Sequence, residues 1–234
     1  MIKKLLVCLA LITLLSPVFS GRVAAQELKL YPVDEASRDV SFKRFRDRLI
    51  AALKRRDRKF LLSSLHPNIR NSFGGDGGVR EFVEMWNLNS RTSKVWSELL
   101  TVLSMGGSFY QEAGRKTFEA PYVSSRWASI SKKLPGGGDA FSYSAIIGEN
   151  VPIYSRPVAA APPLAFLSYD VVEVDHDRSV FDSNLEELRW VKIKTLKGQE
   201  GFVHPDRIRS AAGQRAYFIK LRGKWVMSAF VGGD

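Results

Sequence analysis

The spacing of the apolar residues changes at one glycine-rich segment of the chain. Segment 129–138 contains Lys132, Lys133, Pro135 and three consecutive glycines, a composition that favours turns over a packed core. Before this segment, apolar residues recur every three or four positions, as on one face of an α-helix; after it they recur every second position, as on a β-strand. We therefore expect an α+β protein, with a helix-rich domain followed by a β-domain.

Residues 27–127 are predicted to form the helix-rich domain. An apolar stripe runs from Phe42 to Leu53 and follows Ser41, a residue that favours helix starts. A second helix is expected to end at His66 and Pro67, because proline cannot continue a helix. This second helix covers 57–65. Segments 79–86 and 95–103 are two further predicted helices, and 117–123 is a predicted strand.

Residues 128–147 are predicted to be a linker, and residues 148–210 a small barrel. Alternation predicts strands over 151–154 and 190–195, and a turn leads into another strand at 201–203. Short strands joined by turns, with no helical pattern between them, favour a closed or nearly closed barrel. Closure removes most of the exposed strand edges.

This segment resembles a bacterial Src-homology-3-type domain. The resemblance is carried by an opening strand that ends in Tyr154–Pro157, a central strand over Leu164–Val174, the strand Trp190–Lys194 and the strand Gly201–Val203. It implies a small β-barrel with a ligand groove. Two loops that border the groove in that family differ here: the first reads Ser-Arg-Pro without the family's glycine, and the second, over 175–188, is longer than usual.

The last segment, 214–234, is predicted to be a β-hairpin. Its strands cover Tyr217–Ile219 and Trp225–Phe230, with a turn at Arg222–Lys224. The closing strand is similar to the last strand of nuclear-transport-factor-2-like domains. The predicted helices within 42–65 resemble the early helices of that family. The resemblance implies that the barrel is inserted in the chain and that the hairpin packs back on the helical domain.

The first 25 residues have the order of a secretory signal peptide. Lys3 and Lys4 precede a short apolar run, and small residues follow up to Ala25. We expect cleavage after Ala25, with Ser20 as the alternative, and a periplasmic or secreted product. A retained anchor is the competing interpretation, but the run is shorter than the ~20 residues of a membrane span. Cys8 lies inside the run, so we expect no lipid anchor.

Three aromatic residues are candidate ligand-binding residues: Tyr154, Tyr169 and Trp190. Aromatic faces commonly line sites for peptides and glycans. Tyr154 and Trp190 are the strongest candidates, because the strand phase sets them opposite the aliphatic core residues. The alternative is that these rings, with Phe202, fill the interior of a small barrel.

Basic residues crowd the first predicted helix, and the full chain has a formal net charge of +11. Such a face attracts anionic polymers or membrane surfaces through its field. In an exported protein, nucleic acid is not the expected partner; a solvated helix face without a ligand is the alternative. The proposed electrostatic patch is Lys43, Arg44, Arg48, Lys54, Arg55 and Arg58.

The sequence favours a protein without catalytic residues, metal or cofactor. Cys8 is the one cysteine and lies in the predicted signal peptide, and neither a His-Glu-x-x-His nor a Gly-x-Ser-x-Gly motif occurs. An acidic cluster lacks the ordered spacing of a calcium loop, so a solvated loop is the simpler interpretation. That cluster is Asp170, Asp175, His176, Asp177 and Asp182.

The leading hypothesis is an exported, non-catalytic binding protein of the bacterial envelope. Its barrel would recognise a cell-wall peptide, a glycan or a protein partner. One alternative is a structural or scaffolding protein without a small ligand. Another is a hydrolase with its pocket in the helical domain.

Overall fold

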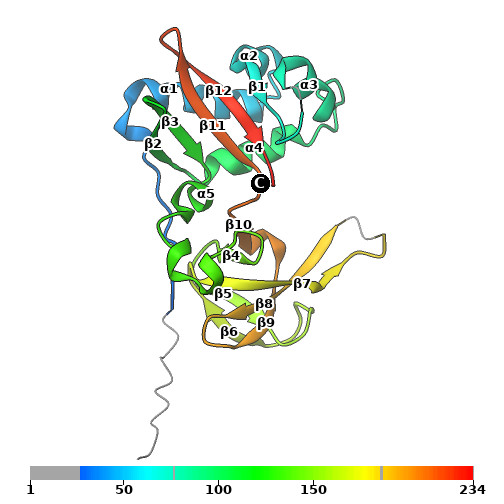
Figure 1. Ribbon diagram of the computed structural model, residues 1–234. Helices are drawn as coiled ribbons and strands as arrows, with labels where there is room; N and C mark the ends of the chain where they lie inside the picture. The colour runs from blue at the N-terminus through cyan, green and yellow to red at the C-terminus, as the bar shows by residue number, and fades with distance from the viewer. Residues whose placement is uncertain (1–26, 76, 185–186, 234) are drawn as a thin grey trace, which may run out of the picture.

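The computed structural model describes residues 27–75, 77–184 and 187–233, so the predicted signal peptide lies outside the described residues. A five-stranded sheet with most of the helices and a seven-stranded sheet lie one above the other in Figure 1. This arrangement confirms the α+β class. Among the described residues, no helix has the length and apolar character needed to cross a bilayer.

Helix α1 (Val40–Lys54) begins at Asp39, whose carboxylate accepts hydrogen bonds from the backbone N–H groups of Ser41 and Phe42. Such a cap satisfies donors that have no partner within the helix. Phe42 and Leu49 are fully buried on its apolar side, as their spacing predicts. The other helices are α2 (Arg58–Ser63), α3 (Gly78–Met85), α4 (Val95–Ser104) and α5 (Tyr122–Trp127), and the 3-10 turns are η1 (Ala36–Arg38), η2 (Ser131–Lys133), η3 (Pro135–Gly137) and η4 (Pro205–Arg207).

The C-terminal hairpin forms the middle of the five-stranded sheet. The order is β1-β12-β11-β3-β2; β1 is parallel to β12 and the other pairs are antiparallel. The hairpin therefore returns to the helical half, as the second resemblance implied. The strands are β1 (Leu65–Arg70), β2 (Ser108–Glu112), β3 (Arg115–Ala120), β11 (Arg215–Leu221) and β12 (Lys224–Val231).

The first half contains more strand than its sequence predicted. The predicted helix over 57–65 ends at Ser63, and strand β1 follows at once, with Pro67 inside it. Proline fits there because β1 is an edge strand, where one missing N–H donor does not break a ladder on both sides. The predicted strand over 117–123 ends at Ala120, where α5 takes over.

Aromatic rings fill the core between the five-stranded sheet and α1. The Phe42 ring centroid lies 4.2 Å from that of Phe118, 5.6 Å from that of Phe218 and 4.9 Å from that of Trp225. These partners come from β3, β11 and β12. One helix residue therefore contacts β3 and also the β11–β12 hairpin, which begins 95 residues after β3 ends.

The second sheet is antiparallel and has the order β10-β4-β7-β8-β9-β5-β6. In the described part of the chain its end strands β10 and β6 do not pair with each other, so the sheet is antiparallel but not closed. Aliphatic side chains, among them Ile146, Ile153 and Val191, form its own core. The strands are β4 (Tyr143–Ile146), β5 (Val151–Tyr154), β6 (Pro163–Leu167), β7 (Val171–Phe181), β8 (Leu188–Thr195), β9 (Glu200–Val203) and β10 (Ile208–Ser210).

Three boundaries in this half differ from the predicted ones. The predicted linker, 128–147, contains β4, which lies between β10 and β7. The predicted central strand, 164–174, is two strands, β6 and β7, separated by a turn in which Tyr169 has a φ of 60°. The predicted loop, 175–188, contains the extension of β7 to Phe181, and the β7–β8 hairpin projects from the sheet (Figure 1).

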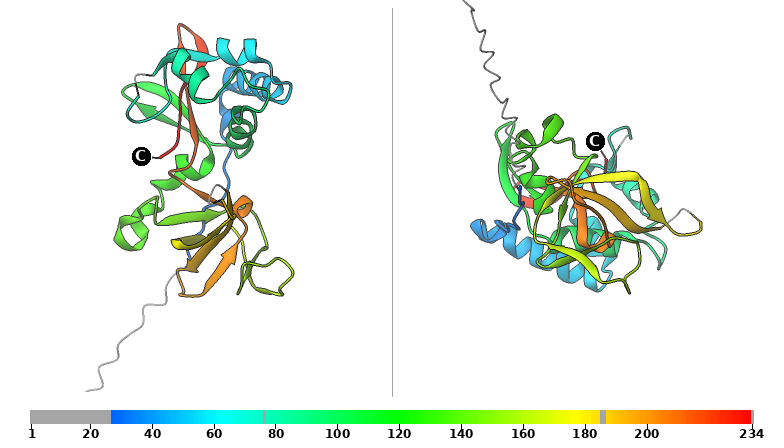
Figure 2. Two further views of the ribbon diagram at one scale, coloured as in Figure 1. Left: turned by 90° about the vertical axis from the view of Figure 1, so that its right-hand side faces the viewer. Right: turned by 90° about the horizontal axis from the view of Figure 1, so that it is seen from below.

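A separate apolar cluster packs the α5–η3 region and the N-terminal segment on the second sheet. Tyr122, Trp127 and Leu134 from the α5–η3 region pack with Val171 of the second sheet and with Leu30. Segment 27–35 contacts both sheets, through a bridge from Lys29 to Asp170 and another from Asp34 to Gly107. Figure 2 shows the two sheets from two further sides, with the N-terminal segment running alongside.

Candidate binding site

The strand register brings Tyr154 and Trp190 to the same side of the second sheet. Tyr154 of β5 is opposite Phe202 of β9, and Val203 of β9 is opposite Val191 of β8. Their inward neighbours Ile153 and Val191 are buried, while Tyr154 and Trp190 are half-buried. The alternation inferred from the sequence therefore places both rings away from the core.

Tyr154, Trp190 and His204 form a chain of rings at near right angles. The Tyr154 and Trp190 centroids are 5.4 Å apart with an interplanar angle of 81°, and those of Trp190 and His204 are 6.0 Å apart at 84°. Edge-to-face pairs of this kind contribute about 0.5–1.5 kcal/mol each beyond the burial of their surface. The aliphatic core of the sheet includes none of the three rings.

These rings line an open cavity of about 280 Å³. Glu149 and Arg207 add one negative and one positive charge to its wall. Within the described ranges, neither side chain makes an ion pair. The cavity thus offers aromatic faces, a hydrogen-bond acceptor and a hydrogen-bond donor, which suits a polar or zwitterionic ligand of moderate size.

Tyr169 does not belong to this cavity. It lies in the turn between β6 and β7, its ring centroid is 5.5 Å from that of Tyr31, and its carbonyl accepts a hydrogen bond from the Leu30 N–H. Its ring thus meets the N-terminal segment and not Tyr154 or Trp190. Phe202 lies next to Lys192, whose ammonium group is 4.9 Å from the ring centroid.

Sequence reasoning did not find His204, Glu149 and Arg207 as parts of the cavity. His204 follows β9 and forms an N-cap at η4, where its Nδ1 accepts a hydrogen bond from the Asp206 N–H. Its position beside Trp190 follows from the Val191–Val203 register. A correct prediction of the β8–β9 register would have placed His204 beside Trp190. Glu149 and Arg207 lie in turns, where no strand register indicates their position.

The predicted basic patch divides into groups with different surroundings. Lys43 pairs with Asp47 at 2.6 Å, and Arg58 donates to the Asn89 side chain at 3.2 Å. Lys54 and Arg55 are exposed near the end of α1. Arg44 and Arg48 instead line a groove between α1, α2 and the β11–β12 hairpin.

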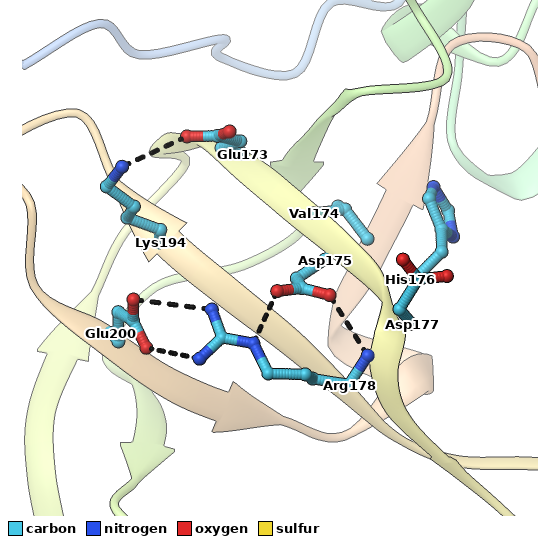
Figure 3. A pocket seen from close by; sticks show the side chains of 8 residues that line it. All are labelled: Glu173, Val174, Asp175, His176, Asp177, Arg178, Lys194 and Glu200. Atoms are coloured by element: carbon cyan, nitrogen blue, oxygen red, sulfur yellow. Dashed lines mark hydrogen bonds and ion pairs between the residues drawn. The ribbon is translucent and has the colours of Figure 1, made fainter.

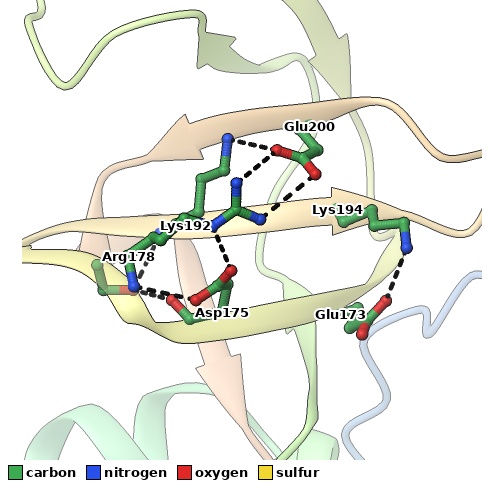
Figure 4. Close-up of polar contacts among 7 residues, drawn as sticks. Glu173, Asp175, Arg178, Lys192, Lys194 and Glu200 are labelled. Carbon is green, nitrogen blue, oxygen red and sulfur yellow. Dashed lines mark hydrogen bonds and ion pairs between the residues drawn. The ribbon is translucent and has the colours of Figure 1, made fainter.

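A second cavity, of about 480 Å³, lies on β7, β8 and β9 and is lined by charged side chains (Figure 3). Arg178 hydrogen-bonds with Asp175 and, through both terminal nitrogens, with Glu200. Lys192 also pairs with Glu200, at 2.9 Å, and Lys194 pairs with Glu173, as Figure 4 shows. Each of these cations has an acidic neighbour, so the network links the strands and offers little unpaired charge to a ligand.

The acidic cluster of the sequence stays together only in part: Asp175, His176 and Asp177 line the second cavity, whereas Asp170 lies elsewhere. Asp170 is buried and pairs with Lys29 at 3.2 Å, while Asp175 belongs to the network around Arg178. The hydrogen bond from Arg178 is the largest cause that lowers the pKa of Asp175. Across the described part of the chain, no group of three or more His, Cys, Asp or Glu residues is placed to hold a metal ion.

Comparison with protein-family models, with curated proteins and with solved structures found no match for this chain.

Proposed function

We propose that the protein is an exported, non-catalytic binding protein of the bacterial envelope, and that the second sheet recognises a cell-wall peptide or glycan. The observation that carries the proposal is the cavity shared by Tyr154, Trp190 and His204. Sugar rings and peptide groups stack on aromatic faces, while Glu149 and Arg207 suit the amino and carboxyl groups of peptide stems.

We also propose that the second sheet is a variant of the Src-homology-3 type. Its support is that the two most specific parts of the resemblance, Trp190–Lys194 and Gly201–Val203, are neighbouring antiparallel strands. The open edge between β10 and β6 departs from a closed barrel. For the helical half, the return of the hairpin to the helices supports a nuclear-transport-factor-2-like arrangement.

The test is retention of the purified protein on purified peptidoglycan at low salt. The double variant Tyr154→Ala/Trp190→Ala is expected to lose most of the retention. Phe166→Ala is the matched control, because Phe166 is an aromatic residue of the same sheet that is 61% exposed and outside the cavity. Circular dichroism of all variants verifies the fold.

Absence of retention for the unaltered protein would rule out the cell-wall ligand. Retention that survives the double variant but disappears at high salt would assign the attraction to the basic helix. Release of labelled fragments from the polymer would favour the hydrolase alternative.

A protein partner is a second candidate, favoured by edge strand β6. Leu164 and Phe166 on this strand are 47% and 61% exposed, and an unpaired strand edge can accept a strand from another chain. In a cross-linking experiment, Phe166→Ala would then weaken capture of the partner while the Tyr154→Ala/Trp190→Ala variant would not.

A further inference from the structure

A groove of about 540 Å³ lies on the helical half, between α1, α2 and the β11–β12 hairpin. Its lining includes Arg44 and Arg48 of α1 and Lys224 at the start of β12. Among the residues that the structure describes, no aspartate or glutamate lines it. The floor is partly apolar, with Phe45, Phe60 and Trp225.

The helix geometry explains why two guanidinium groups face the same groove. Arg44 and Arg48 are four residues apart, which places them on neighbouring turns of one helix face. Two like charges at this spacing destabilise a helix slightly, and an anion between them would reverse that effect. The Arg48 guanidinium lies 5.1 Å from the Phe60 ring centroid, which holds it over the groove.

The cations of the groove lack acidic partners. Among the described residues, the side chains of Arg44 and Lys224 make no hydrogen bond or ion pair, and the Arg48 side chain makes only its contact with Phe60. The acids nearby are already engaged: Asp47 pairs with Lys43, and Asp39 pairs with Lys116 and Lys220. This distinguishes the groove from the cavity around Arg178, where carboxylates neutralise each cation.

The hydroxyl and indole groups of the groove are engaged in holding its shape. The Trp225 Nε1–H donates to the Ser41 Oγ at 2.9 Å, and the Ser41 hydroxyl donates to Asp39 at 2.6 Å. The Ser63 and Ser64 hydroxyls both donate to the Phe60 carbonyl. The free donors are therefore the three cationic side chains, and they come from two different elements that the Trp225–Ser41 bond ties together.

We propose that this groove binds the phosphate group of a phosphomonoester or phosphodiester. The three side chains bring three positive charges from α1 and β12 to one groove, and phosphate oxygens accept charge-assisted hydrogen bonds from both guanidinium and ammonium groups. The apolar floor suits the organic part of such a ligand. The inference concerns the helical half and stands whether or not the aromatic cavity of the second sheet binds cell-wall material.

The experiment measures binding of glycerol 3-phosphate by titration calorimetry, and of phosphatidylglycerol vesicles by co-sedimentation, with phosphatidylcholine vesicles as reference. Arg44→Gln/Arg48→Gln and, separately, Lys224→Gln are compared with Lys54→Gln/Arg55→Gln. The last variant removes the same charge as the first, at the C-terminal end of α1 and outside the groove. All of the altered side chains are exposed, so the fold is expected to persist, and thermal unfolding verifies this.

The groove variants are expected to raise the dissociation constant at least tenfold, and Lys54→Gln/Arg55→Gln by less than twofold. If glycerol 3-phosphate binds with this pattern, a soluble phosphate ester is sufficient for binding. If only the phosphatidylglycerol vesicles bind with this pattern, the ligand is a lipid headgroup. Equal weakening by both double variants would overturn the proposal, because the helix field alone would then explain the attraction. So would the absence of binding to both probes by the unaltered protein.

Discussion

Tyr217 of β11 lies directly opposite Glu119 of β3 on the sheet face that is turned away from Phe118 and Phe218. Burial is the largest influence on Glu119 and raises the pKa of its carboxyl group to about 7, although Tyr217 and Arg215 act in the opposite direction. Burial likewise raises the pKa of Tyr217. Burial therefore keeps the Glu119 carboxyl group neutral up to near-neutral pH, in spite of the opposite influence of Tyr217.

The pH dependence of stability should show this shift. The pKa of Glu119 is about 7 in the folded state against 4.5 for an ordinary glutamate, so folding takes up a proton between these values. The stabilisation is complete below pH 4.5 and is lost as the pH rises through 7, which lowers the free energy of unfolding by roughly 3 kcal/mol. The glutamine of the Glu119→Gln variant stays neutral throughout. The free energy of unfolding of this variant should therefore increase relative to that of the unaltered protein as the pH rises.

Urea unfolding of both proteins across this pH range measures the difference directly. Other carboxyl groups titrate equally in the two proteins and cancel. Parallel stability curves would show that Glu119 has an ordinary pKa.

Gly106→Ala should destabilise the protein more than Gly114→Ala. Both glycines have a positive φ, 71° and 76°, which costs an alanine about 1–2 kcal/mol. At Gly106 a Cβ atom would also come within 2.5 Å of the Val33 carbonyl oxygen, whereas at Gly114 no atom of the described residues outside its chain neighbours lies within 4 Å. We expect at least about 1 kcal/mol of additional loss at Gly106. Equal losses in thermal unfolding would contradict the close approach of the N-terminal segment.

The Asp34–Arg46 pair should be sensitive to removal of its acid alone. Arg46, on the buried side of α1, donates to both Asp34 oxygens at 2.6 and 2.8 Å. Asp34→Ala would leave a nearly buried guanidinium group without an acid and cost about 1–3 kcal/mol, since Asp34 is itself half-exposed. Asp34→Ala/Arg46→Met, which removes the charge as well, should recover part of this loss in chemical denaturation. A double variant less stable than Asp34→Ala would argue against the explanation.

Truncation after Ser210 should unfold the helical half, although it removes none of its helices. The deletion takes away β11 and β12, which supply Phe218 and Trp225 to the ring cluster around Phe42. Far-ultraviolet circular dichroism is expected to show a loss of helical signal. A control truncation after Val231, where β12 ends, should retain it. Undiminished helical signal in the short form would show that the helices fold without the hairpin.

Long, strongly periodic segments could be predicted from the sequence, whereas pairings between distant segments could not. The stripe from Phe42 to Leu53 and the alternation in 151–154 each follow from local spacing, and so does the outward phase of Tyr154 and Trp190. Strand β1 was missed because a six-residue edge strand with Pro67 offers little alternation, and its parallel pairing with β12 joins residues some 160 positions apart.

Charge patterns were the least informative part of the sequence. Arg46 stands among exposed basic residues in the helix, yet it is buried because it falls on the stripe of Phe42 and Leu49. Tyr169 was an aromatic candidate like Trp190, but its turn conformation directs it to Tyr31. The register of the strands is needed to distinguish an aromatic residue that lines the cavity, such as Trp190, from one that lies elsewhere, such as Tyr169.

The central position of β11 and β12 in the first sheet sets an order of events during biosynthesis. All strands of the seven-stranded sheet leave the ribosome before residue 215, so that sheet can assemble while the chain is still growing. Helix α1 emerges first but must wait for the last strands, with Phe42 and Leu49 uncovered in the meantime. The part of the protein that is made earliest is thus the part that matures last, and its nascent apolar face is where a chaperone would be needed.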